Sequence, residues 1–499
     1  MISLRFAVRC VAATLLKMLS RRPLLWLLLG GLLVHGLTAV GVILRTGRLD
    51  TFSFDSLDCE EYYRIARNIV EHRVFSNDTA PPLRFDTWRT PGYPALLAGG
   101  MSLVGKSPVA LIIIQQIVAA IGVIVLFRVS RSHMSDRRAA AVSVLFLLAP
   151  YRLFYSFWLL STTWFTTLLL VLWWTVERAR RGGHWTWCAA AGLLSGLLVL
   201  VWPGAILIPV ATLACVLLRF RCEEPNRGVT INSASAMPLS NDRRPGGAPG
   251  RDRPRKAAAF LFCCGIVVSS WMVRNLSVAG HFALSHQSGI VLAYFKATEV
   301  ELWRQGRTAD RYIETSLNPS SAQVPHTVWD EIDTGLRKRL SGKTTDESAS
   351  IRWSNLAQGN RTGLDSFEVS RELTLIAWDY FRRSPWTTLA CGLVRVGENL
   401  VFPLGLIIDG PMGVTVQRAQ SAALGAFYSL IAVAALVGAI RSRRHWPARL
   451  FPIGCLCALA LTTTPQIDPR FRVPMIPLML FVALLPQCNG KDEIQDSTI

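Results

Sequence analysis

Acidic residues are scarce in this sequence. Only 17% of the 499 residues are charged, and Lys and Arg outnumber Asp and Glu by 53 to 33. A soluble chain of this length would form about three domains with charged surfaces. The apolar residues here instead occur in continuous runs that reach the roughly 20 residues needed to cross a bilayer. The sequence also lacks the short alternating segments of a membrane β-barrel. It therefore predicts an all-α polytopic membrane protein.

The sequence also lacks metal-ligand clusters and a disulfide framework. The 11 cysteines lie mostly within apolar runs, where cysteine behaves as a small hydrophobic residue. The eight histidines are scattered, without acidic or cysteine companions at ligand spacing. We therefore predict no metal site and no cofactor, although a divalent metal ion stays compatible with the sequence.

Positive charge is unevenly distributed along the chain. It gathers in short stretches beside apolar runs, at 128–138, 178–181, 219–256 and 441–449. This positive-inside distribution sets membrane orientation and attracts anionic lipids. We therefore predict membrane lipids as partners and no nucleic acid.

The apolar runs predict ten membrane spans. The N-terminal run is too long for a signal peptide and lacks a small-residue cleavage pattern, which favours a retained first span. With the N-terminus inside, alternation places the basic loops inside and the more acidic segments outside. The predicted spans are 23–44, 107–128, 138–155, 157–176, 184–202, 203–219, 257–274, 418–440, 447–464 and 471–487.

Two further apolar segments do not suit a membrane crossing. Residues 93–105 form too short a segment, and residues 386–408 carry Arg395 and Glu398 in the middle. We predict that both form helices at the outer membrane interface.

The chain is expected to divide into four regions. The exterior region shows helix-like patterns at 328–340 and 368–381. No internal repeat stands out, which counts against inverted-repeat transporters. The regions are an N-terminal membrane module at 1–275, with its first exterior loop at 45–106 and a cytoplasmic linker at 220–256, an exterior soluble region at 276–385, a C-terminal membrane region at 386–487, and a cytoplasmic tail at 488–499.

An acidic helix is predicted in the first exterior loop. Residues 62–69 place apolar side chains at helical spacing, and Asp58 and Glu61 stand at the start of this pattern. One interpretation is structural, since both acids can cap the helix and suit its dipole. The other is catalytic, because a carboxylate at the water–lipid boundary can take a proton from an acceptor hydroxyl or amine.

Arginines on the predicted exterior side are candidates for binding phosphate, because guanidinium pairs with phosphate bidentately. Arg89 precedes the turn-forming sequence Pro91-Gly-Tyr-Pro94. The alternative is that such arginines extend from the membrane boundary into water. Arg470 and Arg472 lie outside against the positive-inside trend, which favours a ligand. The candidates are Arg84, Arg89, Arg274, Arg470 and Arg472.

In this order, the motifs resemble a GT-C membrane glycosyltransferase. The similar group is glycosyltransferase family 39-like and contains protein mannosyltransferases and aminoarabinose transferases. The resemblance rests on Asp58…Tyr62…Ala66-Arg-Asn-Ile, Arg89-Thr-Pro-Gly-Tyr-Pro94, Pro150…Tyr155-Ser…Leu159-Leu-Ser161, Gly192…Gly196…Pro203, Trp271…Arg274-Asn275 and Arg470-Phe-Arg…Pro474…Pro477.

The resemblance implies a GT-C-like bundle of about ten transmembrane helices with an exterior soluble cap. It implies a hexosyl- or pentosyltransferase that takes a sugar from polyprenyl phosphate and passes it to a lipid, glycan or protein acceptor. The compact size favours a bacterial inner membrane, with the active site facing the periplasm. The implied catalytic pair is Asp58 with Glu61, and Arg89 matches a position near the donor phosphate. The implied substrate pocket contains Tyr62, Tyr93 and Asn275.

Two positions depart from the family pattern. Thr162 follows Ser161 where relatives often carry an acid, and Trp202 precedes Pro203 where they often carry arginine. These departures leave open an inactive GT-C scaffold that binds polyprenyl phosphate. A lipid-linked sugar transporter or flippase is the other alternative, and it would place charges near the bilayer midplane. The predicted spans hold few such charges, which favours the transferase.

Overall fold

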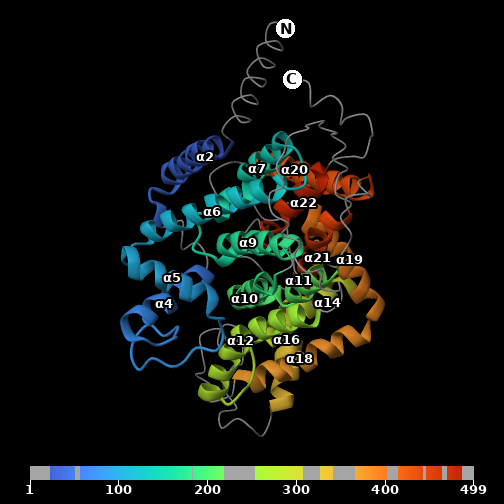
Figure 1. Cartoon of the computed structure of the whole chain (residues 1–499). Helices are drawn as coiled ribbons and strands as arrows, with labels where there is room; N and C mark the ends of the chain where they lie inside the picture. The colour runs from blue at the N-terminus through green and yellow to red at the C-terminus, as the bar shows by residue number, and fades with distance from the viewer. Residues whose placement is uncertain are drawn as a thin grey trace, which may run out of the picture.

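The computed structural model describes residues 23–50, 57–182, 184–218, 253–306, 326–340, 366–401, 414–441, 446–463 and 469–485. The regular secondary structure in these ranges is helical, without a strand (Figure 1). The predicted all-α membrane bundle is confirmed. Among the described helices, four are long and apolar enough to cross a membrane, at Leu25–Leu44, Pro108–Arg131, Arg253–Ala279 and Trp446–Thr463.

The first half of the chain supplies most of the bundle and a helix pair, α4 and α5, from the segment predicted to lie on the exterior side. Its elements are α2 (Pro23–Thr46), α4 (Leu57–His72), α5 (Gly92–Val104), α6 (Pro108–Arg131), α7 (Asp136–Leu147), α8 (Pro150–Tyr155), α9 (Ser161–Gly182), α10 (Trp185–Val201), the 3₁₀ helix η1 (Pro203–Ala205) and α11 (Ile208–Leu217).

The second half supplies the exterior region and the last bundle helices. Its elements are α12 (Arg253–Ala279), α13 (Gln287–Ile290), the π-helix η2 (Val291–Ala297), α14 (Thr298–Arg304), α16 (His326–Leu340), α18 (Ser366–Arg383), α19 (Pro385–Val401), α20 (Val414–Arg441), α21 (Trp446–Thr463), the 3₁₀ helix η4 (Pro469–Arg472) and α22 (Met475–Leu484).

The predicted spans mostly correspond to these helices, but the single span at 138–155 is wrong. The chain forms α7 and α8 instead, and Pro150 begins the second helix. Proline lacks an N–H group, and its ring clashes with the preceding helical turn, which favours a break in the helix before Pro150. Parts of the linker 220–256, of the last exterior loop and the whole tail 488–499 lie outside the described residues.

Helices α10 and α12 pack against each other more extensively than any other described pair. Small residues make this possible, because they allow backbones in a membrane to approach closely. A Cβ atom on Gly192 would lie 2.3 Å from the Phe260 carbonyl oxygen, and one on Gly196 would lie 2.8 Å from the Val267 Cβ. Helix α10 in turn packs on α9, and α9 on α6, so this contact attaches α12 to the rest of the bundle.

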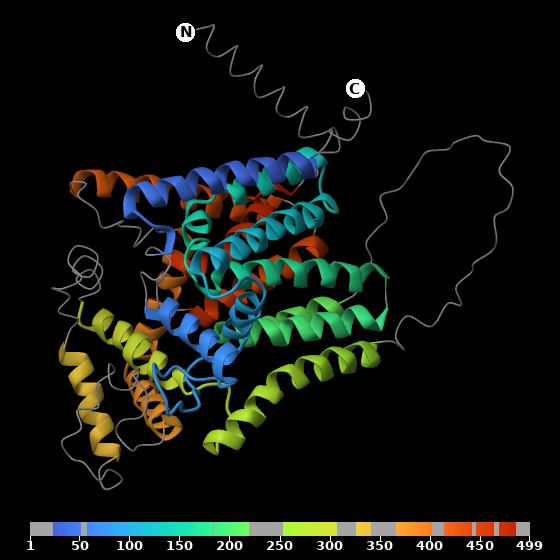
Figure 2. The ribbon, with the colours of Figure 1, turned by 90° about the vertical axis from the view of Figure 1, so that its left-hand side faces the viewer.

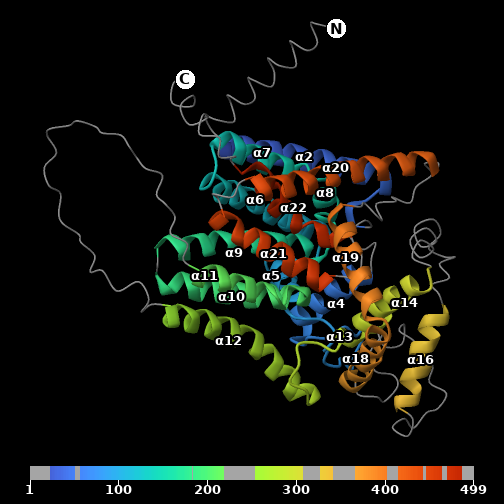
Figure 3. The same ribbon diagram turned by 90° about the vertical axis from the view of Figure 1, so that its right-hand side faces the viewer.

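A second apolar core lies outside the bundle. It joins side chains of α13, η2, α16 and α18, including Ile290, Tyr294, Val328 and Leu373. These helices gather at one end of the bundle, and α19 runs across that end (Figure 3). The helical patterns predicted at 328–340 and 368–381 are confirmed as α16 and α18, and the two short apolar segments form α5 and α19.

The connections between α6 and α7 and between α9 and α10, which carry basic residues, lie at the opposite end of the bundle (Figure 2). Arg180 Nη1 donates a 2.7 Å hydrogen bond to the Pro447 carbonyl, and Arg181 Nη2 donates a 3.4 Å bond to the Ser132 carbonyl. Three loops that are far apart in sequence therefore meet on one side, as the predicted alternation of the spans requires.

The glycine contact between α10 and α12 gives a stability prediction. Gly192→Ala should destabilise the protein by about 2 kcal/mol, because overpacking forces the two backbones apart. Gly265→Ala is the matched control on α12, since no atom lies within 4 Å of the added methyl group. Thermal unfolding in detergent should show a lower midpoint for the first variant only, and equal midpoints would contradict this packing account.

Candidate active site

The candidate site is a cavity of about 650 Å³ at the end of the bundle that the sequence predicts to face the exterior. Its wall combines the start of α4, the loop before α5, η1, the segment entering η2, the end of α21 and η4. Four of the residues that the sequence predicted as site residues line it, namely Asp58, Tyr62, Arg89 and Arg470. The cavity thus brings together segments that lie far apart in the sequence at the predicted water–lipid boundary.

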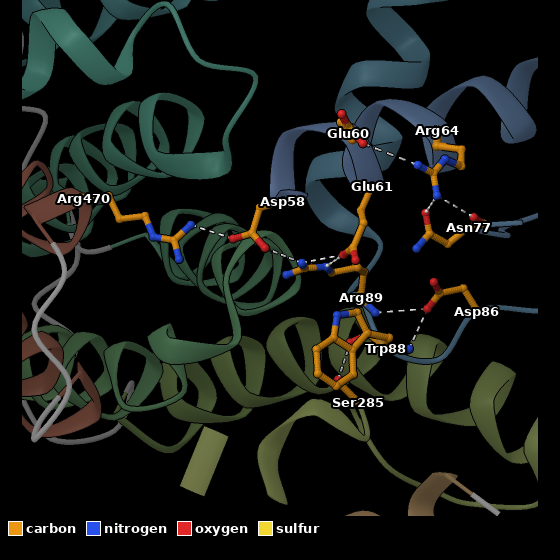
Figure 4. Close-up of polar contacts among 10 residues, drawn as sticks. All are labelled: Asp58, Glu60, Glu61, Arg64, Asn77, Asp86, Trp88, Arg89, Ser285 and Arg470. Atoms are coloured by element: carbon orange, nitrogen blue, oxygen red, sulfur yellow. Dashed lines mark hydrogen bonds and ion pairs between the residues drawn. The ribbon is translucent and has the colours of Figure 1, made fainter. Parts of the chain in front are cut away.

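Arg89 lies between the two carboxylates of α4 (Figure 4). Its Nη2 atom donates to Asp58 Oδ1 at 2.5 Å, and its Nε atom donates to Glu61 Oε2 at 2.7 Å. The guanidinium also stacks over the Tyr62 ring, with Cζ 5.0 Å from the ring centroid. The Arg89 side chain is only 7% exposed, so these partners supply the counter-charge that water cannot. The acids predicted as helix caps thus hold an arginine of the next loop.

The backbone around Arg89 is fixed by a turn. Asp86 Oδ1 accepts hydrogen bonds from the N–H groups of Trp88 at 2.6 Å and Arg89 at 3.1 Å. The Ser285 hydroxyl donates to the Trp88 carbonyl at 2.6 Å, and the Trp88 ring belongs to the exterior core. The loop is therefore attached to the exterior region through Trp88 and to α4 through Arg89.

Arg470 completes the ion cluster from the opposite end of the chain. Its Nη1 atom donates to Asp58 Oδ2 at 2.6 Å, so each Asp58 oxygen faces a different guanidinium. Burial raises the pKa of the Asp58 carboxyl, but the charges of Arg89 and Arg470 outweigh burial and hold this pKa well below its usual range. Asp58 is therefore ionised throughout the physiological pH range.

The pKa of Glu61 shifts in the opposite direction. Burial raises its pKa, and the Arg89 charge offsets this only in part. Two neighbouring carboxyls thus have pKa values that are moved apart, which is a pattern found at catalytic acid–base pairs.

The other predicted site residues lie outside the cavity wall. Arg84 pairs with Asp78 at 2.9 Å and is half-exposed. Arg274 Nη1 donates to the Asp86 carbonyl at 2.7 Å and to Asn275 Oδ1 at 2.9 Å, which supports the Arg89 turn from behind.

Asn275, Tyr93 and Arg472 are also engaged by protein groups. The Asn275 amide donates to the Ala283 and Leu284 carbonyls, so it holds the segment that lines the cavity. The Tyr93 hydroxyl donates to Gln115 Oε1 at 3.2 Å, and the Arg472 side chain is fully buried with its guanidinium over the Tyr151 ring. These three side chains therefore contact neighbouring protein groups and do not line the cavity.

The two departures from the family pattern both face the cavity. Thr162 lines the wall where relatives often carry an acid, and Trp202 lines it where they often carry arginine. The Trp202 ring stacks on Phe471 with centroids 5.3 Å apart and meets Phe165 edge-on at 4.9 Å. Both positions therefore place an uncharged side chain at the wall of the site, polar at Thr162 and aromatic at Trp202.

Sequence reasoning missed Lys296. It belongs to η2, and its Nζ atom donates to the Thr462 carbonyl at 2.8 Å beside the cavity. Burial lowers its pKa to about 8. The only sequence signal is a single lysine in the apolar run Ile290–Ala297, and such a run is typical of a buried helix. In the part of the chain that the structure describes, no group of three or more His, Cys, Asp or Glu side chains is placed to hold a metal ion.

With this geometry in place, comparison with known proteins supports the predicted class. Residues 88–227 match the family model described as dolichyl-phosphate-mannose-protein mannosyltransferase. The match includes Arg89 and the wall residues Thr162 and Trp202, and it confirms the resemblance to GT-C membrane glycosyltransferases. A search of curated proteins finds no significant match.

Solved structures with low similarity were also found. The oligosaccharyltransferase AglB from Archaeoglobus fulgidus, in complex with an inhibitory peptide and a dolichol-phosphate, shares 17% identity and a TM-score of 0.43 over 94% of this chain and 50% of that chain. ArnT from Cupriavidus metallidurans, bound to undecaprenyl phosphate, shares 12% identity and a TM-score of 0.36 over 92% and 77% of the two chains. The present chain spans about half the length of the oligosaccharyltransferase. Because both TM-scores are low, the site chemistry is inferred from this chain's own residues.

The ion cluster predicts that substitutions of Arg89 and of Arg84 differ sharply in their effect on stability. Arg89→Met should destabilise the protein by on the order of 3 kcal/mol, because it leaves the partly buried Glu61 without a cation and Asp58 with Arg470 alone. Arg84→Met should change stability by less than about 1 kcal/mol, since its pair with Asp78 is exposed. Unfolding curves of both variants in the same detergent test this, and equal losses would contradict the central role of Arg89.

Proposed function

We propose that this protein is an integral-membrane glycosyltransferase that moves a sugar from a polyprenyl-phosphate donor to a lipid, glycan or protein acceptor. The reaction takes place at the exterior end of the bundle, which is the periplasmic side of a bacterial inner membrane. The observation that carries the proposal is that Asp58, an ionised carboxylate, lines the same cavity as Arg470 and contacts it. The family model that matches 88–227 is named for a mannose donor on dolichyl phosphate, which supports the same class of donor.

The wall of the cavity suits an amphiphilic donor. Aromatic rings of Trp202, Phe165 and Phe471 cover one part, where a sugar face or an isoprenoid unit can pack. Cationic side chains occupy another part, where a phosphate group can bind. A ligand with an apolar tail and an anionic head fits both surfaces at once.

The transfer is a single displacement at the anomeric carbon. An acceptor hydroxyl oxygen forms a bond to this carbon, and the bond from the carbon to the phosphate oxygen breaks. The phosphate leaves with the electron pair, and the hydroxyl proton passes to an Asp58 oxygen. Fixed positive charge at the cavity stabilises the departing phosphate. The displacement inverts the anomeric centre.

Arg470 links donor binding to the strength of the base. A carboxylate that contacts two guanidinium groups is ionised but weakly basic, because both charges oppose protonation. When Arg470 turns towards a donor phosphate, Asp58 keeps only Arg89, and its pKa rises. Asp58 thus becomes a better base when the leaving group is in place. Glu61 shares Arg89 with Asp58 and keeps this arginine in position.

A catalytically inactive scaffold is the second candidate. It is favoured by one observation, that Thr162 and Trp202 both line the cavity where the family often carries an acid and an arginine. Such a protein would bind polyprenyl phosphate without turnover. Sugar transfer by the purified protein separates the two functions.

Removal of the proposed base should abolish most of the activity. Asp58→Asn should reduce transfer from a polyprenyl-phosphate sugar by at least about a hundredfold, because the amide cannot accept the acceptor proton. The assay measures sugar transfer or release by the purified protein in lipid, with a panel of donors. Asp136→Asn is the control, since Asp136 pairs with Arg131 at the basic end. Turnover that survives in Asp58→Asn would exclude Asp58 as the base.

Arg470 should determine the pH at which the reaction slows on the acid side of its pH profile. In Arg470→Gln, the pKa of Asp58 rises because burial is opposed by one cation fewer. Asp58 then takes up a proton at higher pH, and the acid limb of the kcat/KM profile moves up by at least about one pH unit. Arg470→Lys keeps the charge and should keep the limb close to that of the wild type. An unchanged limb in Arg470→Gln would contradict this role.

A further inference from the structure

Three cationic side chains line the cavity, and they differ in how their charge is balanced. Arg89 contacts Asp58 and Glu61, and Arg470 contacts Asp58. The ammonium group of Lys296 donates to a neutral acceptor, the Thr462 carbonyl at 2.8 Å. Among the described residues, none with a carboxylate is paired with it. With both carboxylates ionised, the cluster therefore holds one positive charge in excess, at Lys296.

The exterior core fixes Lys296 in place. The neighbours Tyr294 and Ala297 are buried in that core, while Phe295 and Lys296 line the cavity. The π-helical geometry of η2 brings this about, since its wider turn changes which side chains share a face. Single π-turns of this kind are frequent at functional sites. Lys296 is thus a positioned cation on a rigid element and not a surface lysine.

Both arginines already neutralise carboxylates, so an anion would compete for their charge. Arg89 pairs with two partly buried carboxylates, and moving it to a phosphate would leave them without their nearest cation. Arg470 pairs with Asp58, and a turn towards an anion would weaken that ion pair. Lys296 has two further N–H donors and gives up no ion pair among the described residues. The hydroxyl group of Ser288 lines the same cavity and can donate to a phosphate oxygen as well.

We propose that Lys296 is the primary binding residue for the phosphate of the lipid-linked donor, and that Arg89 positions Asp58. This inference rests on the proposed function, and it reassigns the phosphate contact that the sequence suggested for Arg89. Arg470 is a second contact to the same phosphate, reached when it releases Asp58. A bound phosphate also supplies a negative counter-charge for the ammonium group of Lys296, which is partly removed from water.

The test is binding of undecaprenyl phosphate and of undecaprenol to the full chain in lipid nanodiscs. We expect the wild type to prefer the phosphate form. Lys296→Met should weaken binding of undecaprenyl phosphate by at least about tenfold, as expected for the loss of a charged hydrogen bond. Binding of undecaprenol should not change, which shows that the variant is folded. Lys296→Arg should stay close to the wild type, because it keeps the charge.

A matched control and two further outcomes make the test decisive. Lys106→Met removes an exposed lysine that pairs with Glu71 outside the cavity, and it should leave binding unchanged. If Lys296→Met binds undecaprenyl phosphate as tightly as the wild type, the assignment of Lys296 is overturned while the proposed function stands. If the wild type shows no preference for the phosphate form, the proposed function itself is contradicted. Stabilisation of the wild type against heat by inorganic phosphate alone would overturn the assignment to a lipid phosphate.

Discussion

The Arg89 guanidinium between the Asp58 and Glu61 carboxylates is the interaction on which the site depends. These groups are largely withdrawn from water, so their charges are stable only while they face one another. The ion cluster joins α4 to the loop before α5, and Arg470 joins both to η4. Trp88, the residue before Arg89, inserts into the exterior core. Trp88 and Arg89 therefore connect the first exterior loop to the exterior region and to the bundle.

This arrangement explains how a chain with few acids can operate a charged site beside lipid. The matched cluster keeps Asp58 ionised, and burial alone would have favoured its neutral form. Lys296 adds a positive charge from a separate element, η2, which the exterior core holds. The proposed base and the proposed phosphate contact thus come from different parts of the fold, and each is positioned by its own packing.

Much of the fold could be predicted from the sequence. Apolar runs predicted most of the bundle helices, because hydropathy acts locally, while the alternation of the spans stays a prediction. The break between α7 and α8 was missed although Pro150 signals it. Within the site, the spacing of Asp58 and Glu61 predicted a helix with acids at its start, and Arg84 has its partner Asp78 only six residues away.

Long-range partners could not be predicted from spacing. Arg470 and Asp58 lie 412 residues apart, and no local pattern links them. Lys296 was missed because the apolar residues around it are typical of a buried helix. The core that buries them forms only when η2, α16 and α18 come together. Arg274 has the same sequence character as Arg470, but it packs on Phe75, Phe85 and Trp271 and supports a backbone turn. Residue type alone therefore did not separate a ligand contact from a structural one.

The most direct test of this account is an experimental structure of the full chain in nanodiscs with undecaprenyl phosphate bound. The account predicts phosphate density in the cavity, in contact with Lys296 Nζ and Arg470, while Arg89 stays on Asp58 and Glu61. Phosphate density at Arg84 or Arg274, outside the cavity wall, would contradict it. So would an Arg89 that leaves both carboxylates to bind the phosphate.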